Sequence, residues 1–191
     1  MRRHSEREGF TLIEIMIVVA IIALLAAIAI PNVLRGRTTA NESAAIGNLR
    51  ALVSSLEMER SVNNIYPDTT ATDWTAAMYG TACGGPAGDP VAPDFGPPSF
   101  CTVPALGLTN FVVQGFAYTY TNGPTAGQTY NLVVDPTTPG TTGSRAFYAS
   151  ETGLVLHCRR LAAAPTAAAA RVPAAGWVTI DVALPVGADC S

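Results

Sequence analysis

The stretch Glu8–Pro31, EGFTLIEIMIVVAIIALLAAIAIP, decides the architecture of this chain. It is apolar along nearly its whole length, and residues 15–30 contain no polar side chain. A helix over residues 10–30 would be about 30 Å long, which is the thickness of the hydrocarbon core of a membrane. The stretch therefore predicts a membrane-spanning helix in which Glu14 is the one charged residue.

The residues before this helix predict its orientation. Arg2, Arg3 and Arg7 precede it, and positive charges favour the cytoplasmic side of a membrane. The alternative is a secretory signal peptide, with a shorter apolar core followed by a small-residue cleavage site. Here the apolar run is longer, and the small residue suited to a protease, Gly9, lies before the run. We therefore expect a short cytoplasmic leader and an extracytoplasmic remainder.

The segment GFTLIEIMIVVAIIALLAAIAIPN resembles the class III signal and amino-terminal helix of type IV pilins and the related pseudopilins. The basic leader ends at Gly9, Phe10 would be the first mature residue, and Glu14 would be the fifth. Pro31 falls where such helices commonly carry a helix-bending proline. The resemblance implies that a prepilin peptidase cuts between Gly9 and Phe10 and methylates the new amino group of Phe10. It also implies that subunits leave the membrane and stack into a helical filament.

Glu14 needs an explanation of its own. An ionised carboxylate inside a membrane costs roughly 2.5–3.5 kcal/mol on translocon-based scales. One interpretation is a tolerated charge that reaches back to the headgroups. The other starts from the ammonium group that cleavage would create on Phe10, because opposite charges that are desolvated together attract strongly. This pairing could form within one helix or between subunits, and the resemblance favours an assembly salt bridge between Glu14 of one subunit and Phe10 of its neighbour.

Beyond Pro31 the pattern changes to an amphipathic helix that ends near Asn63. One apolar stripe recurs at helical spacing: Ile46, Leu49, Val53 and Leu56. Pro31 removes a backbone hydrogen bond and Gly36 lowers helix propensity, so we expect a bend over residues 31–40. The expected organisation is a cleaved leader (1–9), a membrane and filament-core helix (10–30), its amphipathic continuation (31–63) and a globular head (64–191).

The head is predicted to be a small antiparallel sheet. Segments rich in β-branched and aromatic residues alternate with turn signals: 114–121, 129–135, 144–150, 153–158 and, less clearly, 176–182. Tyr118, Tyr120 and Phe147 follow the strand period and are interpreted as sheet packing. Residues 66–110 are expected to form an irregular loop. A long helix packed at its distal half on such a meander is an α+β fold.

The cysteines indicate an oxidising compartment. Cys83, Cys101, Cys158 and Cys190 all follow the apolar segment, and none of them forms a C-x-x-C pair. Their number and position predict disulfides, for which three pairings are open. Cys83–Cys101 and Cys158–Cys190 are favoured because they close the shortest loops, although loop entropy depends weakly on length.

Other functions find little support in the composition. The arginines are scattered, and the pair Arg159-Arg160 is interpreted as a solvated strand end, so no specific nucleic-acid partner is expected. His157 is the one histidine beyond the apolar helix and is interpreted as structural. We expect no catalytic group, no cofactor and no metal site. The chain would be the substrate of the prepilin peptidase, not an enzyme.

The expected function is thus a structural subunit of a homo-oligomeric type IV pilus. It would lie in the inner membrane, in contact with lipid and the pilus or type II secretion assembly machinery, and afterwards on the cell surface. Two alternatives stay open: a pseudopilin of a type II secretion system, and a monomeric membrane-anchored binding domain. Major pseudopilins typically carry an Asp-rich calcium loop near the carboxy terminus, which this sequence lacks. The sequence does not separate major from minor pilin.

Overall fold

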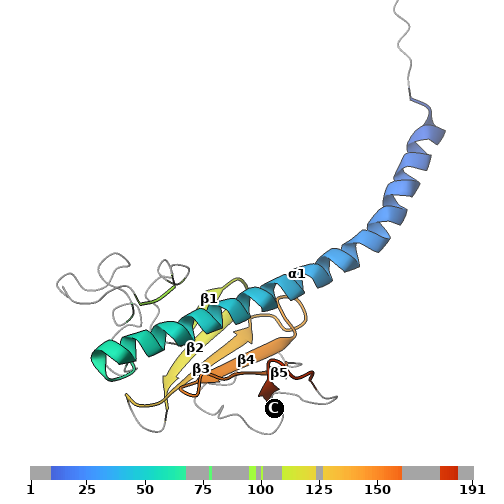
Figure 1. The fold of residues 1–191 in the computed structure, drawn as a ribbon. Helices are drawn as coiled ribbons and strands as arrows, with labels where there is room; N and C mark the ends of the chain where they lie inside the picture. The colour runs from blue at the N-terminus through green and yellow to red at the C-terminus, as the bar shows by residue number, and fades with distance from the viewer. Residues whose placement is uncertain are drawn as a thin grey trace, which may run out of the picture. The chain divides into compact units, whose positions relative to one another are not determined.

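The structure, a computed structural model, describes residues 10–67, 78, 95–97, 100, 109–123, 127–160 and 177–184. The chain divides into two compact units, Met1–Arg37 and Thr38–Ser191, and each is described by itself. One helix, α1 (Leu12–Asn63), belongs to both units (Figure 1). The predicted single long helix is therefore confirmed.

In the first unit, α1 is apolar on all sides. It contains a window of 18 residues that is long and apolar enough to cross a membrane, and none of that window is buried. Large apolar side chains from Leu12 to Leu34 are about half exposed or more. A surface of this kind is typical of a helix that contacts lipid or other protein helices.

Pro31 lies within this helix and has no N–H to donate to the carbonyl of Ala27. The side-chain amide of Asn32 donates to the neighbouring carbonyl of Ile28 at 3.1 Å. A Cβ at Gly36 would meet no atom within 4 Å among the described residues, so none of these residues requires glycine there. The bend over residues 31–40 stays a prediction.

In the second unit, the distal part of α1 packs on the sheet through one apolar stripe. Leu49, Val53 and Leu56 are buried as the helical spacing predicts, and Ile46 packs against them partly buried. The helix ends at Asn63, and Asn64 adopts a left-handed conformation with φ of 59°. The N–H of Asn64 donates to the carbonyl of Arg60 at 2.8 Å, a common way to end a helix.

The sheet is an antiparallel meander in chain order, β1-β2-β3-β4-β5-β6, with one face covered by α1 (Figure 1). Its strands are β1 (Thr109–Val113), β2 (Phe116–Asn122), β3 (Tyr130–Pro136), β4 (Arg145–Ser150), β5 (Val155–Arg159) and β6 (Val178–Thr179). Each strand pairs with its sequence neighbours. The predicted α+β fold is confirmed.

Three predictions about the sheet were wrong in detail. The segment expected to be loop up to residue 110 already contains the start of β1 at Thr109. The predicted strand 114–121 instead begins with a tight turn, since Gln114 and Gly115 both have positive φ, of 51° and 79°. Two consecutive left-handed residues are typical of a two-residue hairpin turn. The last strand, β6, has two residues where seven were predicted.

The core between helix and sheet is rich in aromatic rings. Tyr118, Tyr120 and Phe147 are fully buried, so their interpretation as sheet packing is confirmed. The rings of Tyr66 and Tyr130 lie edge to face with centroids 4.8 Å apart. Such contacts add about 0.5–1.5 kcal/mol beyond the burial of apolar area. This core holds the sheet on the distal half of α1.

Candidate functional site

The first candidate site is the start of α1. The N–H of Glu14 donates to Oγ1 of Thr11 at 3.3 Å, and the N–H of Ile15 donates to the carbonyl of Thr11 at 3.3 Å. Thr11 is therefore the N-cap, and Glu14 lies three residues into the first turn. Thr-x-x-Glu at these positions is the pattern of a capping box. A carboxylate there also interacts favourably with the positive end of the helix dipole.

This geometry gives Thr11 a capping role that the sequence interpretation missed. The signal was present, because Thr11 and Glu14 have the capping-box spacing. Phe10 lies just before the cap, and its side chain is 80% exposed. Gly9 lies outside the described residues. The structure thus describes Phe10 and Glu14 at one exposed helix end, while their salt bridge stays a prediction.

The second candidate site joins α1 to the sheet. Oε1 of the buried Glu42 accepts hydrogen bonds from the backbone N–H of Ser144 at 2.7 Å and from its hydroxyl at 2.9 Å. Oε2 of Glu42 accepts from Nε of Arg145 at 2.8 Å. We call these three residues the helix–sheet joint. Because one carboxylate satisfies three donors from the start of β4, the joint fixes this end of the sheet against the helix.

His157 extends the joint to the segment after β6. Nδ1 of His157 lies 3.4 Å from Nη1 of Arg145, and Nε2 lies 3.0 Å from the carbonyl of Val182. Arginine can only donate, so Nδ1 accepts, and Nε2 must carry the proton to donate to the carbonyl. The buried imidazole therefore connects β4, β5 and the residues after β6, which agrees with the predicted structural role.

The structure describes only some of the remaining residues that were singled out in the sequence. Cys158 is buried and disulfide-bonded, whereas Cys83, Cys101 and Cys190 lie outside the described residues. The two favoured pairings, Cys83–Cys101 and Cys158–Cys190, therefore stay predictions. The solvated interpretation of Arg159-Arg160 was wrong for Arg160.

Arg160 is buried and contacts β3 and the residue before β4. Its Nε lies 3.8 Å from Oδ1 of Asp135, and its N–H donates to the carbonyl of Ser144 at 2.8 Å. Arg159, in contrast, is exposed. One member of the pair is thus an internal ion-pair partner, and only the other is a solvated strand-end charge.

A buried carboxyl group lies near the distal end of α1. Glu59 is 4% exposed, and its Oε2 has no hydrogen-bond partner in the part of the chain that the structure describes. Burial raises the pKa of Glu59 to about 8, against a smaller lowering by Asn63. The folded head therefore holds a proton on Glu59 at neutral pH, whereas an unfolded chain releases it at the usual pKa near 4.5.

This difference predicts that the head loses stability as the pH rises. Between about pH 4.5 and 8 the folded state binds more protons than the unfolded state, so the free energy of unfolding falls with pH. The expected loss is on the order of 5 kcal/mol. Glu59→Gln should be insensitive to pH over this range and more stable than the unsubstituted chain at pH 9. Urea unfolding followed by near-ultraviolet circular dichroism measures the free energy of unfolding at each pH. The same pH dependence in both chains would contradict the prediction.

The comparison with family models concerns the amino-terminal segment. The model of a family described as "Prokaryotic N-terminal methylation motif" matches residues 5–30. This range contains the apolar helix together with Phe10, Thr11 and Glu14. The matched motif thus coincides with the capped helix end.

Curated relatives come from two kinds of assembly. Type II secretion system core protein G of Vibrio cholerae is 36% identical over 69 residues, which cover 36% of this chain and 47% of the relative. The same protein of Escherichia coli is 38% identical over 69 residues, 36% of this chain and 48% of the relative. Type IV wide pilus major component PilA4 of Thermus thermophilus is 47% identical over 64 residues, 34% of this chain and 49% of the relative.

The matched regions cover only part of this chain and only part of each relative. The chain spans about half the length of the curated relatives that it matches, as the coverage of 47–49% shows. No solved structure matches the chain. The chain is thus similar, over about a third of its length, to components of type II secretion systems and of a type IV pilus, and it carries the prokaryotic amino-terminal methylation motif over residues 5–30.

Proposed function

We propose that this chain is a structural subunit of a type IV pilus filament, polymerised through its apolar amino-terminal helix. The observation that carries the proposal is an apolar helix whose side chains are exposed on all sides, with one carboxylate in its first turn. Lipid accounts for the apolar surface before assembly. Neighbouring helices account for it afterwards, and they also supply a partner for Glu14.

The proposal includes processing of the precursor. A prepilin peptidase cuts between Gly9 and Phe10 and methylates the amino group of Phe10, so the leader with Arg2, Arg3 and Arg7 is lost. The mature subunit resides in the inner membrane before it is incorporated into a filament on the cell surface. The amino group of Phe10 in one subunit and Glu14 in its neighbour form the salt bridge. The chain is structural and supplies no catalytic group.

A second candidate is a pseudopilin of a type II secretion system. Relatives named as core protein G of that system favour it. A pseudopilin would share the processing and the helix packing, but its filament would not extend from the cell surface. Abundant fibres sheared from the cell surface support the pilus, whereas a mature chain confined to the inner membrane supports the pseudopilin.

Gly9→Leu tests the cleavage position. We expect the peptidase to reject the bulky side chain, so the chain stays in the membrane with residues 1–9 attached. Gly47→Leu is the matched control, because a Cβ at Gly47 meets no atom within 4 Å. Mass spectrometry of the membrane fraction distinguishes the two variants. An unchanged mature mass for Gly9→Leu would refute the assigned cut.

A further inference from the structure

The charges at the two ends of the apolar helix enclose an uncharged stretch of membrane length. Glu14 precedes this stretch, Arg35 follows it, and residues 15–34 between them carry no charge. Twenty residues of α-helix are roughly 30 Å long, which matches the hydrocarbon core of a membrane. Val33 and Leu34 are 57% and 55% exposed, so the exposed apolar surface continues to the last residue of the stretch.

Asn32 is the one polar residue among residues 15–34, and its side chain has an acceptor within the helix. Its amide donates to the carbonyl of Ile28 at 3.1 Å. A polar side chain that is bonded to its own helix loses less on entering hydrocarbon than one without a bond. The whole stretch is therefore suited to lipid.

The helix has two candidate positions in a membrane. With residues 10–30 in the hydrocarbon, as expected from the sequence, the backbone of Glu14 lies roughly 6 Å inside the core. With residues 15–34 there, no charged residue lies in the core. Because a charge within the hydrocarbon is costly, the second position is the more favourable one.

In the second position, two arginines fall within the layer of lipid headgroups. Arg35 and Arg37 lie roughly 1.5 Å and 4.5 Å beyond Leu34 along the helix axis. The headgroup layer is roughly 5–8 Å thick on each side of the hydrocarbon. Both arginine side chains are exposed. A guanidinium group binds phosphate oxygens through paired hydrogen bonds, so lipid phosphate suits these two side chains chemically.

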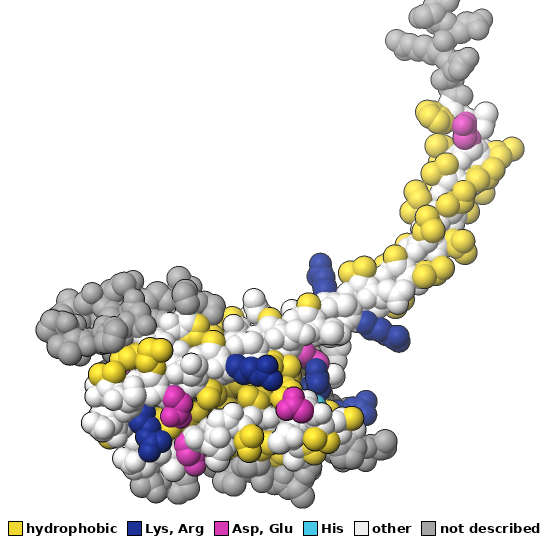
Figure 2. Space-filling view, viewed as in Figure 1, with side chains coloured by type: hydrophobic (Ala, Val, Ile, Leu, Met, Phe, Trp, Pro, Cys, Tyr) yellow, Lys and Arg dark blue, Asp and Glu magenta, His cyan; other side chains and the backbone are white. Residues whose placement is uncertain are grey.

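The directions of the two side chains favour lipid over a protein partner. Residues two apart in an α-helix point roughly 200° apart around the axis, so Arg35 and Arg37 leave α1 on nearly opposite sides. Figure 2 shows Lys or Arg side chains on both sides of the helix where its apolar surface ends. Headgroups surround a membrane-spanning helix completely, whereas a single protein surface contacts one side of it.

We propose that, before assembly, Arg35 and Arg37 bind phosphate groups of lipid headgroups and hold residues 15–34 across the hydrocarbon core. The inference rests on the membrane-anchored stage of the proposed function. The head follows these arginines, so the leaflet that they bind is the outer one. The leader of the precursor carries three arginines and still has the larger positive charge, which agrees with its cytoplasmic side.

Solid-state nuclear magnetic resonance tests the contact with phosphate directly. The full chain, with an isotope label at Cζ of arginine, is placed in vesicles of phosphatidylethanolamine and phosphatidylglycerol. Dephasing of the label by lipid phosphorus then reports guanidinium groups that lie beside phosphate. The amount of dephased signal per chain should fall in Arg35→Gln/Arg37→Gln, and an unchanged amount would overturn the inference.

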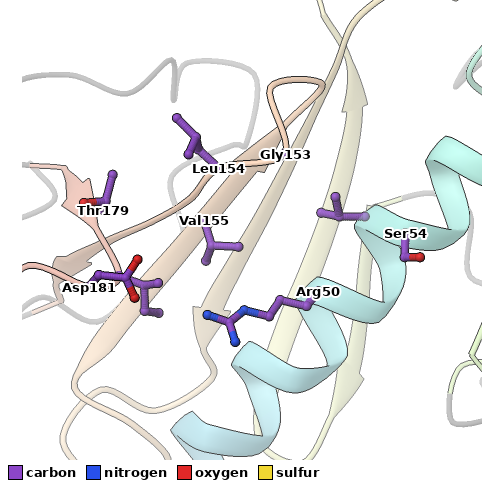
Figure 3. A pocket seen from close by; sticks show the side chains of 9 residues that line it. Arg50, Ser54, Gly153, Leu154, Val155, Thr179 and Asp181 are labelled. Atoms are coloured by element: carbon purple, nitrogen blue, oxygen red, sulfur yellow. The ribbon is translucent and has the colours of Figure 1, made fainter.

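Arg50 provides the matched control, because it is also exposed on α1 but belongs to the head. Figure 3 shows it extending from α1 toward the last strands, beside a groove of about 440 Å³. Arg50→Gln removes a guanidinium group that the inference does not place at the headgroups. The dephased signal per chain should therefore stay the same, and a fall as large as in the double variant would contradict the assignment.

Spin labels at two alanines test the position of the helix. Ala20 and Ala29 are exposed and lie equally far from the middle of residues 15–34. Nitroxides on Ala20→Cys and Ala29→Cys should therefore be equally accessible to oxygen, which concentrates at the centre of a bilayer. The unsubstituted chain measures the background from the native cysteines. With residues 10–30 in the core, Ala20 would be central and Ala29 near the edge, so a clearly greater accessibility at Ala20 would overturn the inference.

The outcomes separate this inference from the proposed function, because both tests use vesicles without filaments. If the double variant keeps its dephased signal while cells still form filaments, the inference fails and the filament function stands. If the unsubstituted chain forms no filaments or inner-membrane pseudopili in cells, the proposed function itself fails, whatever the vesicles show.

Discussion

Glu14→Gln should abolish surface filaments while the processed chain still accumulates in the membrane. The reason is that the backbone N–H of residue 14 still donates to Oγ1 of Thr11 in this variant, and glutamine also fits the capping-box pattern, but glutamine has no charge for the amino group of a neighbouring Phe10. Removing one partner of a desolvated ion pair costs about 3–5 kcal/mol, which is more than a hundredfold in an equilibrium constant. The measurement compares sheared filaments with membrane-bound mature chain by immunoblot.

The control for this prediction separates the two roles of Glu14. Thr11→Ala removes the N-cap hydroxyl and keeps the charge, at a cost of about 1 kcal/mol to the helix end. We expect Thr11→Ala to retain filaments and Glu14→Gln to lose them. The reverse order would mean that Glu14 acts through the helix cap, and the proposed salt bridge would then be wrong.

Glu42→Ala should strongly destabilise the head. It leaves the guanidinium of Arg145 and the backbone N–H of Ser144 without their acceptor at the joint. Arg145 is 30% exposed in its side chain, so water recovers part of the loss, and we expect about 2–3 kcal/mol. Urea unfolding of the mature chain in detergent, followed by near-ultraviolet circular dichroism, measures the change.

The pH dependence of this effect has a defined sign. Burial raises the pKa of Glu42, but the hydrogen bonds from Ser144 and Arg145 outweigh it and hold the pKa below the usual value. Glu42 therefore stabilises the fold above its ordinary pKa, and this contribution is lost as the pH falls through the lowered one. The difference between Glu42→Ala and the unsubstituted chain should shrink in acid. Glu151→Gln, an exposed carboxylate, is the control, and an equal loss there would contradict the assignment.

The main elements of the fold were predictable because they depend on local patterns. The all-apolar run 15–30 allows a helix in lipid, and the stripe through Leu49 and Leu56 allows one helix face to pack on a sheet. Period-two segments separated by Gly and Pro predict hairpins, and the meander confirms this. The capping box at Thr11 was also readable from spacing alone.

The helix–sheet joint was not predictable in this way. Glu42 meets Ser144 and Arg145 across more than a hundred residues of chain, and no local spacing indicates such a pair. The burial of Glu59 likewise depends on what packs against α1, since its position on the helix does not distinguish it from the exposed Glu57. Polar residues of this kind become informative only when tertiary contacts are known.

The central claim is that this chain is cut after Gly9 and built into filaments through the new end. The most direct measurement is the intact mass and amino-terminal sequence of the subunit in fibres sheared from cells. The account predicts a chain that begins at Phe10 and is heavier by one methyl group on its amino nitrogen. A fibre subunit that still begins at Met1, or that begins within or after the apolar segment, would contradict it.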